Sequence, residues 1–142
     1  MVQNLSIMLI MAFLSPVSLT TTPPKDNLQV HIQGFDLDTD TKVWVSVFSR
    51  EGFLKEPIQS KFVPVSGNKL TLTFELPQGD YAVSTYQDTN RNGKLDRRFY
   101  GPPKEPYGFS NEVKPSFGPP KYDRCKFEIK EIQKTITINL IK

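Results

Sequence analysis

The sequence is poor in the two residue types that most often carry catalytic and metal chemistry. Its 142 residues include one cysteine, Cys125, and one histidine, His31. One cysteine allows no disulfide within the chain and no cysteine-based metal site. A nucleophilic triad would need His31 as its base, but His31 lies in a strand-like pattern. We expect His31 on a strand surface and Cys125 buried as a small core residue. These two expectations argue against triad enzymes and most transition-metal sites.

The sequence also lacks long helical patterns and a concentration of one charge. No segment of ten or more residues repeats apolar side chains at the helical period. The formal net charge is only +3, and acidic and basic residues are mixed along the chain without a Lys/Arg stripe. This balance predicts no nucleic-acid partner.

The first residues form a segment distinct from the rest. Residues 1–24 contain no charged side chain, and Ile7 to Leu14 make an apolar run. That run is too short to cross a membrane and suits the core of a signal peptide. We therefore expect a signal peptide over 1–22, cleaved near 18–22, and an exported domain over 23–142. The domain would be periplasmic or extracellular, with no transmembrane segment in its mature form. The alternative is a buried N-terminal helix.

Short runs of alternating apolar and polar residues fill most of the remaining chain. The run 42–48 has apolar residues on both faces, which indicates a central strand, and Pro64 places 61–65 at a sheet edge. Because Ser66-Gly67-Asn68 reads as a turn, 61–65 and 70–74 are predicted to form a hairpin. The pattern predicts an all-β fold, a single antiparallel β-sandwich of about seven or eight strands. The predicted strands are 28–35, 42–48, 61–65, 70–74, 81–86, 126–129 and 134–140.

Two further stretches refine this prediction. Leu76-Pro77-Gln78-Gly79-Asp80-Tyr81 is typical of a sandwich corner, in which the tyrosine hydroxyl bonds to backbone. The segment 97–122 is rich in proline, glycine and aromatic residues. It is too long for an ordinary connection and too aromatic for disorder. We expect it to be an ordered loop folded over one end of the sandwich.

Asp88 to Asp96 is the stretch with the clearest chemical signal. Oxygen-bearing side chains occupy its first, third, fifth and ninth positions, and Gly93 occupies the sixth, as in a calcium loop. The predicted ligands are Asp88, Asn90, Asn92, the Lys94 carbonyl and Asp96.

Two features limit the predicted calcium affinity. The twelfth position is Phe99 instead of a bidentate glutamate, and basic residues surround the two carboxylates. The site would be weak unless Glu105 joined it. The alternative needs no ion, since Asn and Asp side chains close turns by bonding their own backbone amides.

The loop and the segment after it carry a family resemblance. Asp88-x-Asn90-x-Asn92-Gly93 is followed by Gly101-x-Pro103-x-Glu105-Pro106-Tyr107-Gly108-Phe109-Ser110-Asn111. From about Leu28 to its C-terminus, the chain resembles a family of bacterial exported proteins, domain of unknown function number 2141. The resemblance implies a small secreted or periplasmic β-sandwich, similar to transthyretin-like or carboxypeptidase-regulatory-like modules, with no established activity.

We expect a monomeric, non-enzymatic binding or accessory module of the cell envelope. Its partner would be a glycan or an envelope protein, because rigid aromatic faces bind with little loss of entropy. A small core beneath the long loop is the other interpretation of its aromatic residues. The predicted ligand-binding residues are Glu105, Tyr107, Phe109 and Asn111.

Two other functions stay open at this point. An envelope hydrolase would use a carboxylate pair, although no spacing singles one out. A purely structural domain, stabilised by loop calcium, is the third. The candidate hydrolase carboxylates are Asp88, Asp96, Glu105 and Asp123.

Overall fold

The computed structural model describes residues 27–37, 41–130 and 133–142. The predicted signal peptide lies outside these residues. Within them, no helix has the length and apolar character needed to cross a membrane. The elements are β1 (Leu28–Gln33), β2 (Lys42–Phe48), β3 (Gln59–Pro64), β4 (Lys69–Phe74), β5 (Gly79–Asp88), β6 (Tyr107–Phe109), the 3-10 turn η1 (Ser110–Glu112), α1 (Tyr122–Cys125), β7 (Phe127–Ile129) and β8 (Lys134–Asn139).

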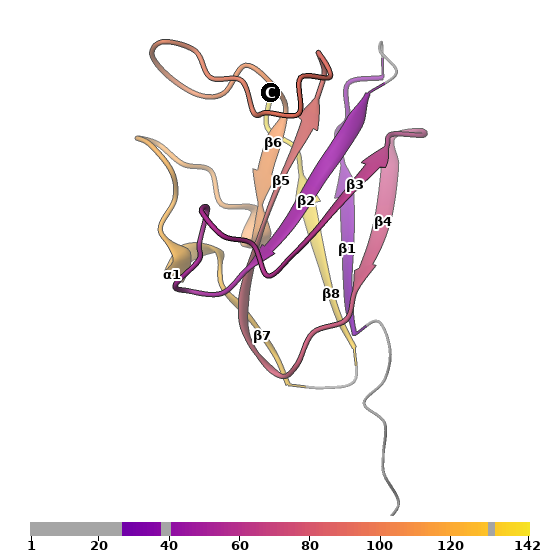
Figure 1. Ribbon diagram of the computed structural model, residues 1–142, viewed down its shortest axis with the longest axis vertical. Helices are drawn as coiled ribbons and strands as arrows, with labels where there is room; N and C mark the ends of the chain where they lie inside the picture. The colour runs from indigo at the N-terminus through magenta and orange to yellow at the C-terminus, as the bar shows by residue number, and fades with distance from the viewer. Residues whose placement is uncertain (1–26, 38–40, 131–132) are drawn as a thin grey trace, which may run out of the picture.

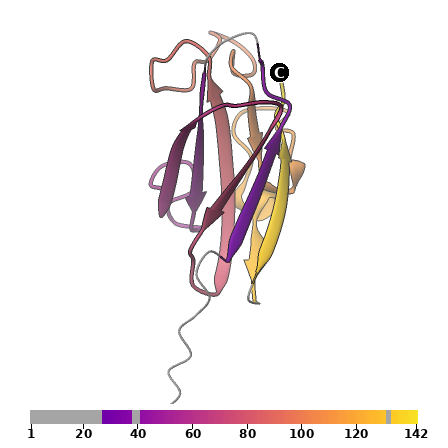
Figure 2. The same cartoon turned by 90° about the vertical axis from the view of Figure 1, so that its right-hand side faces the viewer.

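The strands form two sheets. One has three strands in the order β4-β1-β8, and the other has the order β3-β2-β5-β6, with β7 pairing the first part of β5. Figures 1 and 2 show the longer strands running along the long axis of the molecule. The all-β class is therefore confirmed. β2 is central and β3 lies at an edge, as predicted.

Alternation along the strands explains why the two sheets share one core. Every second residue of β1 and β2 is buried, beginning with Leu28 and Val43. β-branched side chains fit such half-buried pleated surfaces well. The predicted corner is also present, because the Tyr81 hydroxyl donates to the Pro77 carbonyl at 2.9 Å. The core cluster includes Leu28, Val30, Ile32, Val43, Val45, Val47, Phe74, Val83, Ile129 and Ile138.

Two predictions about strand pairing were wrong. β3 and β4 do not form a hairpin: β3 pairs with β2, while β4 pairs with β1 in the other sheet. The turn after β3 therefore carries the chain from one sheet to the other. The fold is also not purely antiparallel, since β1 and β8 run parallel. These strands lie far apart in the sequence, so no tight turn imposes an antiparallel direction on them.

A second, smaller cluster lies on the other side of β5. Ala82 of β5, Val113, Tyr122 and Cys125 are buried there, with Phe53 and Phe109 packed against them. Cys125 is fully buried, as predicted, but it belongs to the short helix α1 instead of an alternating strand. This cluster anchors the second half of the long Pro/Gly/aromatic segment to the five-stranded sheet.

Candidate functional site

The loop after β5 is closed by its own hydrogen bonds. Asp88 is 1% exposed, and its two carboxylate oxygens accept the backbone N–H groups of Asn92 (3.1 Å) and Gly93 (2.8 Å). The Asn90 and Asn92 side-chain oxygens accept the N–H groups of residues two positions on, Asn92 and Lys94. This is an Asx-turn pattern, and Gly93 supplies the positive φ of 74° that the bend requires.

Glu105 closes the same loop from sixteen residues away. Its side chain is 3% exposed. One oxygen accepts the Thr89 N–H at 2.8 Å, and the other accepts the Asp96 N–H at 3.0 Å. Buried carboxylates need such donors, because desolvation without partners is costly. Glu105 therefore supports the loop backbone.

The two interpretations of this loop can now be compared with its geometry. The Asn90 and Asn92 side-chain N–H groups both donate to Asp96. Oxygens that would ligate calcium thus already accept N–H groups of the loop. In the described part of the chain, no group of three or more His, Cys, Asp or Glu residues is placed to hold a metal. The geometry favours the Asx-rich turn, and calcium at residues 88–96 stays a prediction.

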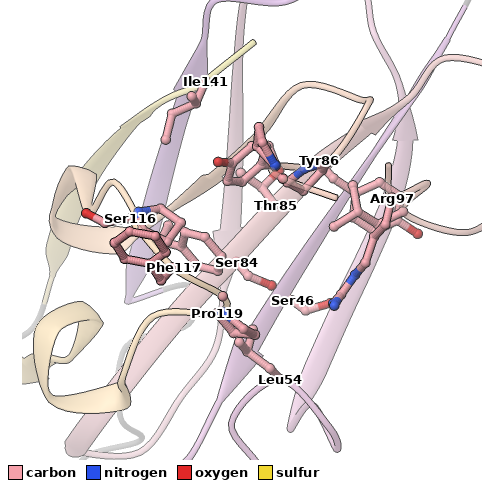
Figure 3. A pocket seen from close by; sticks show the side chains of 18 of the residues that line it. Ser46, Leu54, Ser84, Thr85, Tyr86, Arg97, Ser116, Phe117, Pro119 and Ile141 are labelled. Atoms are coloured by element: carbon pink, nitrogen blue, oxygen red, sulfur yellow. The ribbon is translucent and has the colours of Figure 1, made fainter. Parts of the chain in front are cut away.

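Beside this loop, the outer face of the five-stranded sheet carries a pocket of about 740 Å³. β2 and β5 supply Ser46 and Ser84, which face each other across the strand pair. Loops supply most of the walls, and Figure 3 shows side chains from both sources around the same space. The apolar lining residues are Phe48, Leu54, Leu95, Pro102, Pro103, Phe109, Pro115, Phe117, Pro119 and Ile141.

The four predicted ligand-binding residues fall into two groups. Tyr107 and Phe109 line the pocket, with ring centroids 6.0 Å apart at 74°. Tyr107 is only 5% exposed, so it forms part of the wall more than a free platform. Glu105 supports the loop, as described above. Asn111 lies elsewhere, where its side-chain N–H groups bond the Arg124 and Lys126 carbonyls.

Tyr86 connects the pocket with the loop. It lines the pocket, and its hydroxyl donates to the Gly93 carbonyl at 3.3 Å. Burial, together with the nearby negative charges of Asp88 and Glu105, raises the pKa of Tyr86 to about 12. The hydroxyl therefore stays protonated near neutral pH and keeps its donor role. The turn and the pocket wall are one connected structure.

Comparison with known proteins agrees with the sequence resemblance. Residues 30–137 match the model of a family described as an uncharacterized protein conserved in bacteria (DUF2141). The chain belongs to this family. No curated protein and no solved structure matches it. The pocket and loop of this DUF2141 chain must therefore be interpreted from their own chemistry.

The hydrolase alternative gains little from the carboxylates. Asp123 lies on the surface, and its Oδ1 pairs with Arg50 Nη2 at 2.5 Å. This hydrogen bond lowers the pKa of Asp123, whereas a general acid needs a raised pKa. Asp88, Asp96 and Glu105 all accept hydrogen bonds from the loop. None of the four lines the pocket.

Sequence reasoning missed several pocket residues in this DUF2141 chain. Ser46 and Ser84 look like ordinary polar strand positions, and their pairing across β2 and β5 follows only from the register. Arg97 is one of the basic residues around the calcium-like loop, and nothing in that position indicates that it lines a pocket. Phe117 is 99% exposed, so the interpretation of the loop's aromatic residues as a small core does not hold for it. Its flanking prolines and glycine were the signal that it belongs to a presented loop.

Proposed function

We propose that this chain is an exported, non-catalytic binding module of the bacterial cell envelope, and that its ligand occupies the pocket on the five-stranded sheet. The observation that carries the proposal is the composition of that pocket. Five aromatic residues and four prolines line it, and a few hydroxyl groups converge on it. Such a mixture is characteristic of small-molecule and sugar sites.

The rigidity of the surrounding loops supports the same function. Pro102, Pro103, Pro115 and Pro119 restrict the backbone of the walls. A preorganised wall loses little conformational entropy when a ligand binds. We propose a ring-containing ligand, such as a segment of a glycan, whose faces would stack on the aromatic side chains. We also propose that the fold is a transthyretin-like sandwich and that the module acts as a monomer.

A neutral fluorescent probe tests the pocket. N-phenyl-1-naphthylamine should become brighter when titrated with the purified chain, because it enters an apolar pocket. Ser84→Phe places a ring in that space and should weaken binding at least about tenfold. Thr137→Phe is the matched control, since Thr137 is exposed on β8 of the three-stranded sheet and does not line the pocket. Equal probe affinity in the wild type and Ser84→Phe would contradict the proposal.

Export is tested separately. Residues 1–26 would be fused to a β-lactamase that lacks its own signal peptide and produced in a bacterial host. We expect ampicillin resistance, and mass spectrometry should find cleavage near residues 18–22. A fusion that stays uncleaved and confers no resistance would reject the export proposal without affecting the pocket.

A further inference from the structure

The charged side chains that line the pocket are of one sign only. Arg97 and Lys142 line it, and within the described ranges no aspartate or glutamate does so. The chain as a whole carries 15 acidic residues against 18 basic ones. The charge of the side chains in the pocket is therefore more positive than the composition of the whole chain would lead one to expect.

The carboxylates that lie nearest to Arg97 in the sequence accept hydrogen bonds within the loop. Asp96 directly precedes Arg97, but its oxygens accept the Asn90 and Asn92 side-chain N–H groups. Asp88 and Glu105 are buried and accept backbone N–H groups of the loop. The loop thus holds its negative charges inside its own hydrogen-bond network instead of pairing them with Arg97.

The side chains of Arg97 and Lys142 differ in whether they already have a hydrogen-bond partner. Lys142 donates from Nζ to the Phe35 carbonyl at 3.4 Å. Among the described residues, no ion pair or side-chain hydrogen bond engages the Arg97 guanidinium. Figure 3 shows the Arg97 side chain extending from its loop in the direction of Ser46, opposite Phe117 in this view. A guanidinium in this position can bind an anion by donating two parallel hydrogen bonds to it.

We propose that the pocket selects an anionic ligand, with Arg97 binding the anionic group and the aromatic and proline wall holding a ring-containing body. This inference rests on the proposed function, since it names the ligand chemistry of the same pocket. An aromatic acid and an acidic sugar share this chemistry. The hydroxyl group of Ser84 would contact the body of either ligand.

A matched pair of probes tests the charge. 8-Anilinonaphthalene-1-sulfonate has the ring system of N-phenyl-1-naphthylamine with one added negative charge. We expect the wild-type chain to bind the anionic probe more tightly, and Arg97→Gln to weaken only that binding, by about tenfold. Arg98→Gln is the control, because Arg98 is the adjacent exposed arginine and does not line the pocket. Added salt should weaken the anionic probe alone.

The outcomes separate the two proposals. If neither probe binds, the pocket function itself is rejected. If the neutral probe binds and Arg97→Gln leaves the anionic probe unchanged, only the charge selection is overturned. An equal loss in Arg98→Gln would also overturn it, because the effect would then be general surface charge.

Competition identifies the source of the anion. Displacement of the anionic probe by 2-naphthoate, and not by 2-naphthamide, would support an aromatic acid. Displacement by digalacturonate, and not by a neutral disaccharide, would support an acidic sugar. If neither anion displaces the probe, the proposal fails.

Discussion

Two phenylalanines of this chain illustrate the difference between its core and its outer loops. Phe74 at the end of β4 is 1% exposed and packs between the sheets, whereas Phe117 is 99% exposed beside the pocket. Strand pairing and a shared apolar core fix Phe74. Phe117 is presented by a loop that contains Gly118 and proline neighbours. The comparison teaches that the core stabilises the fold while the outer loops form a surface available to other molecules.

The two regions also use different interactions. The core is apolar and close-packed, and its stability derives from burial. The outer loops depend on buried polar groups, such as Ser110, whose hydroxyl accepts the Val83 N–H and donates to the Cys125 carbonyl. Removing a partner from such a network leaves a buried donor or acceptor unsatisfied. The four predictions below test this difference.

The largest effect is expected at the core. Phe74→Ala removes a buried ring and leaves a cavity between the sheets, which should lower the free energy of unfolding by about 3–5 kcal/mol. Urea denaturation followed by far-UV circular dichroism measures it. A loss below about 1 kcal/mol would mean that Phe74 is not a core residue.

A smaller effect is expected in the loop. Asp88→Asn replaces one of two acceptor oxygens with a donor facing the Asn92 or Gly93 N–H, and should cost about 1–3 kcal/mol. Urea unfolding in EDTA and in millimolar calcium measures it. A structural turn predicts the same loss in both solutions. A loss that appears only in calcium would establish the metal site instead.

The next effect concerns alkaline pH. Burial raises the pKa of the Cys125 thiol from 9.0 to about 11. The folded state therefore holds this proton more tightly, so its contribution is complete below pH 9 and is lost between pH 9 and 11. The wild type should lose roughly 1–2 kcal/mol more than Cys125→Ala across this window. Parallel pH-dependent unfolding curves for the two proteins would contradict the prediction.

The smallest effect on stability is expected at the exposed phenylalanine. Phe117→Ala should change the free energy of unfolding by less than about 0.5 kcal/mol, because little area is buried there. Phe117→Ala should nevertheless weaken binding of the neutral probe, because the substitution removes an aromatic ring from the pocket wall. Destabilisation as large as that of Phe74→Ala would erase the distinction between the two regions.

The sequence was most informative where local chemistry determines local structure. Alternation located the strands, and the Pro77–Tyr81 spacing predicted the corner hydrogen bond. Partner choice could not be predicted in the same way. The turn at Ser66–Asn68 shows that the chain reverses, but β3 and β4 enter different sheets because each completes an edge elsewhere.

The candidate site was predictable only in part. The Asx pattern at 88–96 was visible, but Glu105 closes the loop through contacts that span sixteen residues. The pocket combines β2 and β5 with loops as distant as 115–119 and with Ile141. Such a surface depends on the strand register and on loop paths, which a pattern of two or three residues does not encode.

The parallel pairing of β1 with β8 has a consequence for synthesis. Leu28 pairs with Lys134, so one side of β1 has no partner until β8 has been made. The β1–β4 pair can form first, but the third strand of this sheet comes from far along the chain, and closing so long a loop makes that step slow. Until β8 is in place, the core between the two sheets lacks Ile136 and Ile138.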